Sequence, residues 1–173
     1  NDLFELIDSN KQTHHVRFVI LCTGVMDIQP EISGSIDPIF PYANVQLADY
    51  CLRCDGHHVL NKKVAVIGHT SVAIWVATML YERYQCSEVS IVTNGEENSF
   101  DQETLDLVNM YQFKMFKSPI SKINGDAKNK ILNGFTLENG ENVNCEYVFV
   151  SLGMIVYNEL AKMLGAELDQ RGF

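Results

Sequence analysis

Cys51 and Cys54 stand three positions apart in the stretch CLRCDGHH, which covers residues 51–58. Two thiols at this spacing can close a disulfide within one turn of chain, and they can also supply two sulfur ligands to a zinc ion. Thiol chemistry depends on the thiolate, which forms more readily beside a positive charge or a helix start. Arg53 and the pair His57 and His58 could supply that positive field. The stretch favours a redox pair, with a metal half-site or two ordinary thiols as alternatives.

The other potential metal ligands are scattered along the chain. A structural zinc site needs four ligands and commonly includes a second Cys-x-x-Cys unit. The sequence has no second unit, so further ligands would have to come from His57, His58, Cys86 or Cys145. Cys22 ends an apolar run and is expected to be a buried small hydrophobe. The five cysteines are irregularly spaced, unlike a disulfide framework, and favour a reducing, cytoplasmic setting.

Composition excludes several classes of protein. The chain has 173 residues, of which 46% are hydrophobic and 20% charged, enough for a buried core. It carries 13 basic and 22 acidic side chains, a net charge of -9 that repels the phosphates of nucleic acids. The longest apolar run, residues 72–77, is far shorter than the roughly 20 residues that span a bilayer. We expect neither a nucleic-acid nor a membrane partner, and a start at Asn1 without methionine suggests a partial polypeptide.

The elements that must position the cysteine pair follow from the apolar pattern. KVAVIG at 63–68 is a short strand that runs into a glycine, and residues 71–84 then carry apolar side chains at helical spacing. EVSIVT at 88–93 is a second strand, so residues 63–93 predict a β-α-β unit with parallel strands. The expected apolar face of the helix consists of Val72, Trp75, Val76, Met79 and Leu80.

The rest of the chain extends this unit to an α/β fold. Helices are expected at about 101–111 and 158–164. Further strands are expected at 16–22, 113–116, 120–123, 130–137 and 147–152. The turn at 139–140 makes part of the sheet an antiparallel excursion. Residues 27–44 contain three of the four prolines, which is typical of a linker.

The turn after the first strand of the β-α-β unit is a candidate nucleotide site. A pyrophosphate binds there when helix N–H groups face it and glycines allow close approach, in the pattern G-x-G-x-x-G/A. The chain keeps the first glycine and the last small residue but has a β-branched threonine in the middle. The candidate cofactor-binding residues of this turn are Gly68, His69, Thr70, Ser71 and Ala73. The pattern is equally consistent with a plain parallel α/β connection.

The end of the second strand bears on which nucleotide could bind. An adenine ribose is normally held there by an acid, or by arginines where it carries the extra phosphate of NADPH. Here residues 93–97 read TNGEE, and no arginine occurs between residues 84 and 170. NADPH is therefore disfavoured. NADH is less penalised, because Glu96 or Glu97 could accept a hydrogen bond from the ribose.

Almost the whole chain resembles thioredoxin reductase of the low-molecular-weight bacterial type, in the pyridine nucleotide-disulfide oxidoreductase family. The most specific likeness is CLRCDG at 51–56 before KVAVIG, since that family carries a redox Cys-x-x-Cys-Asp-Gly in its pyridine-nucleotide domain. VILCTG at 19–24 resembles the strand and Thr-Gly turn that close the first part of the family's FAD domain. YVFVSLG at 147–153 resembles the strand that leaves the nucleotide domain, and LGAELDQRGF at 164–173 the segment before the second FAD-contacting motif.

The resemblance implies a Rossmann-like, three-layer NAD(P)-binding-type domain flanked by pieces of an FAD-binding domain. Residues 1–40 would be the end of the first half of the FAD domain and a linker. Residues 41–152 would be the NAD(P)-binding-like domain with the cysteine pair, and residues 153–173 the return segment to the FAD domain. Thr23 and Gly24 would contact FAD, whose other contacts would lie outside the chain, so the chain alone is not expected to hold FAD.

The same likeness implies roles for the cysteine motif. Cys54 would face the flavin, Cys51 would attack a substrate disulfide, and Asp55 would donate a proton. Electrons would pass from FAD through the cysteine pair to a thioredoxin-like protein disulfide, in a homodimer whose domains rotate. Two departures, Thr70 and residues 93–95 in place of a basic His-Arg-Arg stretch, make NADPH or NADH doubtful and leave a donor such as a ferredoxin open. The alternatives are a non-enzymatic Rossmann-like domain for protein binding or redox sensing, and a zinc-binding module.

Overall fold

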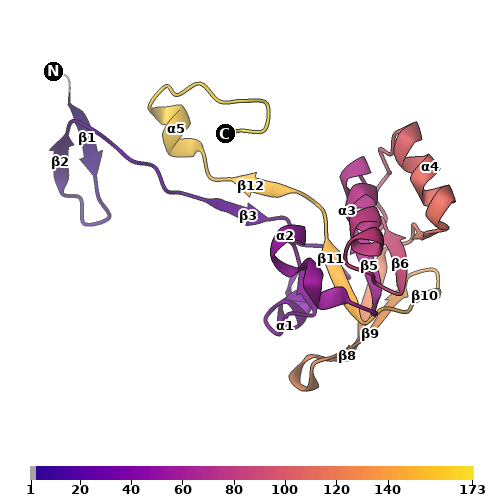
Figure 1. The fold of residues 1–173 in the computed structure, drawn as a ribbon. Coiled ribbons are helices and arrows are strands. Elements are labelled where there is room, and N and C mark those ends of the chain that lie inside the picture. The colour runs from indigo at the N-terminus through magenta and orange to yellow at the C-terminus, as the bar shows by residue number, and fades with distance from the viewer. Residues whose placement is uncertain (1–2) are drawn as a thin grey trace. The chain divides into compact units, whose positions relative to one another are not determined.

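The computed structural model describes residues 3–173 and divides into two compact units. The larger unit consists of residues 27–153 and contains the cysteine pair. The smaller unit combines residues 3–26 with residues 154–173. Figure 1 shows the path of the chain through the elements of each unit. No helix among residues 3–173 has both the length and the apolar character needed to cross a bilayer.

The core of the larger unit is a five-stranded sheet in which every neighbouring pair is parallel. In order across the sheet, the strands are β4 (Ala48–Asp49), β11 (Tyr147–Val150), β5 (Lys63–Ile67), β6 (Glu88–Val92) and β7 (Lys114–Phe116). All of β11 and all of β5 except its first residue are buried, as expected for parallel strands that are covered on both faces. Because β5 and β6 pair in parallel, the predicted β-α-β unit is confirmed.

Both helices predicted beside this sheet form, as α3 (Ser71–Glu82) and α4 (Gln102–Tyr111). α3 packs against β5, β6 and α4, but it buries a different face from the predicted one. Its buried residues are Ala73, Ile74, Ala77, Thr78 and Leu80. Val72 and Trp75 are instead 61% and 43% exposed. The two alanines let the helix backbone approach the sheet closely, so the bulkier side chains turn outward.

The predicted antiparallel excursion is confirmed as a separate three-stranded sheet in the order β10-β9-β8. Its strands are β8 (Ile120–Asp126), β9 (Ile131–Leu137) and β10 (Asn142–Val143), with the turn η3 (Ala127–Asn129) between the first two. Gly134 makes the closest approach in this sheet, because a Cβ there would lie 1.8 Å from the carbonyl oxygen of Val143. Its φ of +114° also favours glycine.

The proline-rich segment is more than a linker. It contains η1 (Asp37–Ile39) and α1 (Phe40–Ala43), each with proline in its first turn, where a missing N–H costs nothing. Three of its side chains belong to the core: Ile32, Ile39 and Tyr42. The interpretation of residues 27–44 as a linker by composition is therefore wrong for this part of the chain.

Two short helical turns after β4 carry the cysteine motif, α2 (Leu52–Asp55) and η2 (Gly56–Val59). Gly56 is buried against an aromatic ring, because a Cβ at this position would lie 2.5 Å from Cζ of Tyr84. Tyr84 follows the end of α3, so this contact fixes the motif to the helix of the β-α-β unit.

The smaller unit has two strand pairs and one helix. β1 (Phe4–Ile7) pairs antiparallel with β2 (Thr13–Val16), β3 (Val25–Asp27) pairs with β12 (Met154–Val156), and α5 (Glu159–Met163) follows. The predicted strand at 16–22 does not form beyond its first residue. Its side chains at Phe18 and Ile20 are 85% and 86% exposed, so they lack the packing that a buried strand requires. Cys22 is likewise exposed, not buried as predicted.

Candidate functional site

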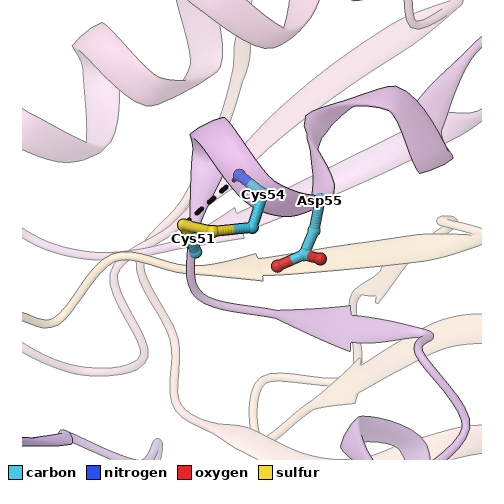
Figure 2. A group of neighbouring side chains, drawn as sticks. All are labelled: Cys51, Cys54 and Asp55. Carbon is cyan, nitrogen blue, oxygen red and sulfur yellow. Dashed lines mark hydrogen bonds between the residues drawn. A yellow bond between two sulfur atoms is a disulfide. The ribbon is translucent and has the colours of Figure 1, made fainter.

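Cys51 and Cys54 are joined by a disulfide at the start of α2. Their Cα atoms are 5.3 Å apart, within the usual range for bridged cysteines. Cys51 is the N-cap of α2, and its sulfur accepts a hydrogen bond from the backbone N–H of Cys54 at 3.3 Å. Neither cysteine is buried. The fold therefore brings the predicted pair together where a second molecule can reach it (Figure 2).

Asp55, the third predicted catalytic residue, lies beside this disulfide. The two sulfurs and a carboxylate oxygen of Asp55 all lie within 4.8 Å of one another (Figure 2). The pKa of Asp55 is raised above its usual value, and burial is the largest cause. The negative charge of Asp49 also raises it, whereas His58 and His57 lower it. A carboxyl group with a raised pKa keeps its proton closer to neutral pH, where it can donate the proton to a thiolate.

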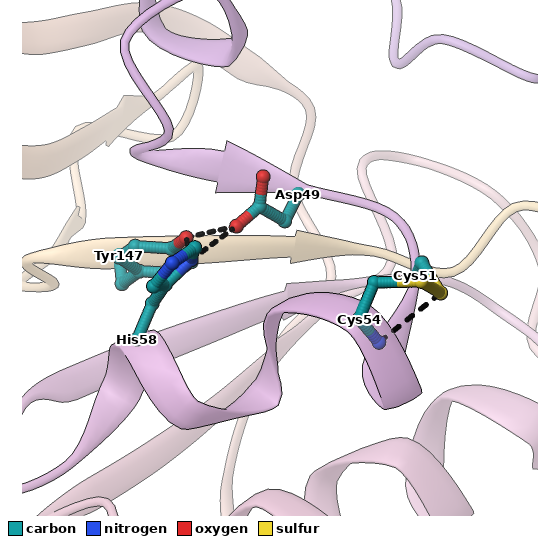
Figure 3. A network of polar contacts seen from close by, with 5 residues as sticks. All are labelled: Asp49, Cys51, Cys54, His58 and Tyr147. Carbon is teal, nitrogen blue, oxygen red and sulfur yellow. Dashed lines mark hydrogen bonds and ion pairs between the residues drawn. A yellow bond between two sulfur atoms is a disulfide. The ribbon is translucent and has the colours of Figure 1, made fainter.

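A second group of polar side chains, which the sequence analysis missed, lies beside Asp55. It consists of Asp49, His58 and Tyr147, and we call it the Asp-His-Tyr cluster (Figure 3). The Tyr147 hydroxyl donates a hydrogen bond to Oδ2 of Asp49. Nδ1 of His58 lies 3.2 Å from the same oxygen and 2.9 Å from the Tyr147 hydroxyl. Side-chain atoms of Asp49, Asp55 and His58 all lie within 4.8 Å of one another, so the cluster adjoins the predicted proton donor.

The parallel sheet brings two members of this cluster together. β4 and β11 pair so that Asp49 lies opposite Phe149, which shares a face of β11 with Tyr147. The side chains of Asp49 and His58 are only 11% and 25% exposed. Burial, and then the hydrogen bond to Asp49, raise the pKa of Tyr147, so this hydroxyl keeps its proton and remains a donor.

The remaining cysteines do not join the pair. Cys86 and Cys145 are free and buried, and burial raises the pKa of each thiol to about 12. Among residues 3–173, only Asp55 adds a further side chain of a metal-binding type close to both sulfurs. Because a structural zinc ion requires four ligands, the described residues provide no such site around the pair.

At the candidate nucleotide turn, the chain's own residues cover the start of α3. The carbonyl oxygen of His69 accepts a hydrogen bond from the N–H of Ser99 at 2.8 Å. Oγ of Ser71 accepts one from the N–H of Asp101 at 2.9 Å. Hydrogen bonds from Thr104, and then from Ser71, lower the pKa of Asp101, so a carboxylate stands beside this helix start. A pyrophosphate at this turn would meet that negative charge.

Packing accounts for the two small residues that the turn shares with the nucleotide pattern. A Cβ at Gly68 would lie 2.7 Å from Cβ of Ala73 and 2.7 Å from the carbonyl oxygen of Ser151. Both residues are therefore small because strand, helix and the end of β11 approach closely here. Thr70, in the middle position, is the N-cap of α3 in an extended conformation.

A cavity of about 550 Å³ lies at the carboxyl edge of the parallel sheet, where open α/β sheets bind their ligands. His69 lines it after β5, and Thr93 and Asn94 line it after β6. Nδ1 of His69 is buried without a hydrogen-bond partner among the described residues. Three lining residues are acids, namely Glu31, Glu96 and Glu138. None of the lining residues in the described chain is a lysine or an arginine.

These residues do not fit NADPH. Its 2′-phosphate requires cationic side chains, whereas the cavity offers three carboxylates. Its pyrophosphate requires an open helix N-terminus, whereas residues 99–101 hydrogen-bond across the start of α3. The departures seen in the sequence at Thr70 and at residues 93–95 thus coincide with an acidic, partly covered site.

Thr23 and Gly24, the predicted FAD contacts, lie in the smaller unit. Oγ1 of Thr23 donates a hydrogen bond to the carbonyl oxygen of Tyr157 at 2.5 Å. Gly24 has a φ of +70°, and no heavy atom lies within 4 Å of the place where a Cβ would stand. Both residues line a cavity of about 240 Å³, so the backbone at Gly24 is open to a ligand. This arrangement fits one contact of a flavin, but the cavity is smaller than common cofactor sites.

Comparison with protein families gives one match over nearly the whole chain. The family of pyridine nucleotide-disulphide oxidoreductases matches residues 2–173. No curated protein matches the chain in sequence.

Solved structures of thioredoxin reductases share the fold. The enzyme from Streptococcus pyogenes is 17% identical with a TM-score of 0.79, and the match covers 100% of this chain and 55% of that one. The T. acidophilum enzyme is 23% identical with a TM-score of 0.68, covering 95% and 53%. The atypical thioredoxin reductase TRi from Desulfovibrio vulgaris Hildenborough is 24% identical with a TM-score of 0.63, covering 98% and 53%. The chain thus spans about half the length of these structures, and the likeness concerns the fold.

Proposed function

The chain belongs to the pyridine nucleotide-disulphide oxidoreductase family, and on this premise we propose that it carries the redox disulfide of a thioredoxin-reductase-like flavoprotein. FAD, when bound, would supply two electrons to the Cys51–Cys54 disulfide, which would pass them to a disulfide of a thioredoxin-like protein. The observation that supports this function most strongly is the disulfide itself, which is not buried and has an acid within 4.8 Å of both sulfurs.

Transfer to the partner protein is a pair of thiol–disulfide exchanges. The Cys51 thiolate attacks one partner sulfur, which breaks the partner's S–S bond and releases the first partner thiolate. Cys54 then attacks the Cys51 sulfur of the mixed disulfide and releases the second partner thiolate. The cysteine pair loses two electrons and two protons, and the partner gains both.

The local geometry supports Cys51 as the attacking sulfur. The backbone N–H of Cys54 points at Sγ of Cys51, and a hydrogen bond of this kind stabilises a thiolate on that sulfur. Asp55 lies close enough to protonate a sulfur that leaves the disulfide when the pair is reduced. FAD, when bound, supplies the two electrons for that reduction, and Thr23 and Gly24 form one of its contacts.

The electron donor belongs to a class without the 2′-phosphate of NADPH. An acidic cavity and a covered helix start are unfavourable to that phosphate and to the pyrophosphate. NADH lacks the 2′-phosphate but still brings a pyrophosphate to the covered helix start, whereas an electron-transfer protein such as a ferredoxin brings neither group.

Several further parts of the proposal rest on family likeness. These are the thioredoxin-like partner, the homodimer, and the division into FAD-domain pieces at 1–40 and 153–173 around a nucleotide-binding-like domain at 41–152. The cytoplasmic setting rests on the odd number of unpatterned cysteines.

Anaerobic titration of the full-length, FAD-loaded protein with dithionite tests this function. The parent protein should take up two electron pairs per flavin, one at the flavin and one at the disulfide, whereas the Cys54→Ser variant should take up one. Cys22→Ser replaces an exposed cysteine outside the pair and is the matched control, with uptake like that of the parent. A parent protein that binds no flavin, or that accepts a single pair, contradicts the proposal.

A second function is favoured by the poor fit to NADPH. A domain that keeps the scaffold and senses redox state through the Cys51–Cys54 disulfide needs no nicotinamide site and no flavin. It predicts a colourless full-length protein whose disulfide still exchanges with small dithiols.

A further inference from the structure

We propose that the Asp-His-Tyr cluster fixes the protonation of Asp55 and thereby sets the pH range in which the Cys51–Cys54 disulfide is reduced. The inference rests on the proposed redox function and adds to it three positioning residues that lie outside the cysteine motif.

The hydrogen bonds of the cluster converge on one carboxylate oxygen of Asp49. Oδ2 of Asp49 accepts the hydrogen bond of the Tyr147 hydroxyl, whose own oxygen is then left as an acceptor. Nδ1 of His58 lies 2.9 Å from that hydroxyl oxygen and 3.2 Å from Asp49, so it satisfies both neighbours only as a donor. Two donors directed at one carboxylate stabilise its ionised form, even though the side chain is only 11% exposed.

Asp49 and Asp55 are two close carboxyl groups, and only one of them receives the donors of the cluster. Carboxylate oxygens of Asp49 and Asp55 lie within 4.8 Å of each other, and two negative charges at this distance oppose each other's ionisation. Burial, and then the charge of Asp49, raise the pKa of Asp55 above its usual range. Asp55 is also the member beside the sulfurs, so the raised pKa favours a proton where disulfide reduction needs one.

Charges of both signs act on Asp55, and they come from separate elements. The charged and titratable side chains around it come from four places. They are Asp49 on β4, His57 and His58 on η2, Tyr147 on β11, and Cys51, Arg53 and Cys54 on its own turn. Lys62, before β5, lies over the ring of Tyr147. The charge of Asp49 favours the protonated form of Asp55, and positive charge on His58 favours the ionised form. These two influences can be removed one at a time.

The proton balance of reduction defines what Asp55 contributes. A thiolate of a small dithiol bonds to one protein sulfur, which breaks the Sγ–Sγ bond, and Asp55 gives its proton to the sulfur that leaves. The second thiolate of the dithiol then displaces the other protein sulfur and closes a cyclic disulfide. The dithiol has lost two electrons and two protons. One of these protons replaces the one that Asp55 gave to the first protein sulfur and the other protonates the second protein sulfur, so that both protein thiols form.

The inference predicts pH shifts of opposite sign in two variants. Only protonated Asp55 donates, so its contribution is present at low pH and is lost as the pH rises through its pKa. Asp49→Asn removes a negative charge, lowers the pKa of Asp55 and moves this loss to lower pH. His58→Gln keeps an amide N–H for Asp49 but removes the imidazole, whose protonated form lowers the pKa of Asp55, so it moves the loss to higher pH. Each shift should be on the order of one pH unit.

The experiment follows reduction of the disulfide by dithiothreitol in the full chain over a series of pH values. Samples are quenched with iodoacetamide, and mass spectrometry counts alkylated Cys51 and Cys54. Dividing each variant's rate by the parent's rate at the same pH removes the titration of dithiothreitol itself. The ratio should fall with rising pH for Asp49→Asn and rise for His58→Gln.

Tyr50→Phe is the matched control. Tyr50 precedes Cys51 and is half-buried, but its hydroxyl donates to Oε1 of Gln29 at 2.5 Å and not to the cluster. Its rate ratio should stay flat with pH. The inference is overturned if Asp49→Asn and His58→Gln shift in the same direction, or if neither ratio depends on pH. General destabilisation would slow or speed both variants alike and cannot produce opposite shifts.

Two further comparisons keep the test decisive. If Asp49→Asn lowers the folded fraction seen by circular dichroism, the rate ratio of His58→Gln is compared with that of Tyr50→Phe, whose hydroxyl bonds to Gln29, to show whether its rise with pH is specific. Asp49→Glu restores the charge and should bring the ratio back toward flat. Because the reductant is a small dithiol, these shifts are measured without flavin. A failed dithionite titration would therefore contradict electron transfer from FAD without contradicting the role of the cluster. Absent pH shifts would contradict the role of the cluster without contradicting electron transfer from FAD.

Discussion

The two sulfurs of the Cys51–Cys54 disulfide have different neighbours, although one covalent bond joins them. A backbone N–H points at Sγ of Cys51, and the carboxyl group of Asp55 lies close to both sulfurs. Tyr147 and His58 in turn contact Oδ2 of Asp49, whose carboxyl group adjoins that of Asp55. At the scale of single residues, the site is therefore a disulfide next to a carboxyl group with a raised pKa, for which we propose the role of proton donor.

Native alkylation should divide the cysteines into three classes. At pH 8 without reductant, iodoacetamide should modify Cys22 alone, since it is exposed and free. Cys86 and Cys145 should resist, because burial raises the pKa of each thiol to about 12 and leaves almost no thiolate. After mild reduction, the two cysteines of the pair should be modified as well. Peptide mass spectrometry gives the count, and labelling of Cys86 or Cys145 in the folded chain would refute this assignment.

The cysteine motif could be predicted from the sequence, whereas the contact between Asp49 and Tyr147 could not. The cysteine pair was identified by its spacing, and Asp55 by the resemblance of CLRCDG to the motif of the family. Asp49 and Tyr147 are 98 positions apart, and only the pairing of β4 with β11 joins them. β4 has only two residues, which is too short to show the alternation of apolar and polar residues typical of a strand. The sequence therefore did not predict this contact.

At the scale of elements, the cysteine turn is held by a close contact between Gly56 and the ring of Tyr84. Gly56 has a φ of -54°, which alanine adopts easily, so any cost of Gly56→Ala comes from the ring and not from the backbone. We expect Gly56→Ala to lower the free energy of unfolding by about 1–3 kcal/mol. Urea unfolding followed by circular dichroism measures this change.

The double variant with Tyr84→Ala is the control for that prediction. With the ring removed, Gly56→Ala should be neutral or slightly stabilising, because alanine restricts the unfolded chain more than glycine does. An equal loss in both backgrounds would show that the ring is not the cause.

Periodic patterns predicted elements better than they predicted burial. The strands of the β-α-β unit were recognisable because continuous apolar runs are typical of parallel strands covered on both faces. The run at 16–22 has a similar composition, but Phe18 and Ile20 are exposed and the run does not extend β2 beyond Val16. On α3, small alanines at the sheet displaced the expected face, which includes Trp75. Composition indicates which residues can be buried, and neighbouring elements decide which are.

At the scale of the whole molecule, the net negative charge and the acidic cavity both disfavour binding of a phosphorylated nucleotide. The net charge of -9 and the carboxylates of Glu31, Glu96 and Glu138 are unfavourable to a nucleotide with an extra phosphate. We expect NADPH to leave the thermal unfolding midpoint of the full chain unchanged, because a ligand stabilises only when it binds the folded state. Differential scanning fluorimetry over a range of NADPH concentrations, with NADH alongside, measures this. A midpoint that climbs with the logarithm of NADPH concentration would show that the cavity accepts the 2′-phosphate.

The smaller unit exposes large apolar side chains that solvent-facing surfaces seldom carry. Phe18, Ile20 and Met163 are 85%, 86% and 80% exposed. In the proposed flavoprotein, we expect further polypeptide or the flavin to cover them, as usually happens to apolar patches of this kind. The family could be predicted from the sequence because the resemblance extends over nearly the whole chain. The extent of the FAD-binding domain could not, because it depends on contacts beyond those within the smaller unit.

Trapping a mixed disulfide tests the central claim most directly. The reduced Cys54→Ser variant of the full-length protein is mixed with an oxidised thioredoxin and resolved on a non-reducing gel, beside the Cys51→Ser/Cys54→Ser double variant. The account predicts a one-to-one adduct through Cys51 that dithiothreitol releases and that the double variant does not form. If the single variant gives no more adduct than the double variant, the cysteine pair does not pass electrons to a protein disulfide of this class.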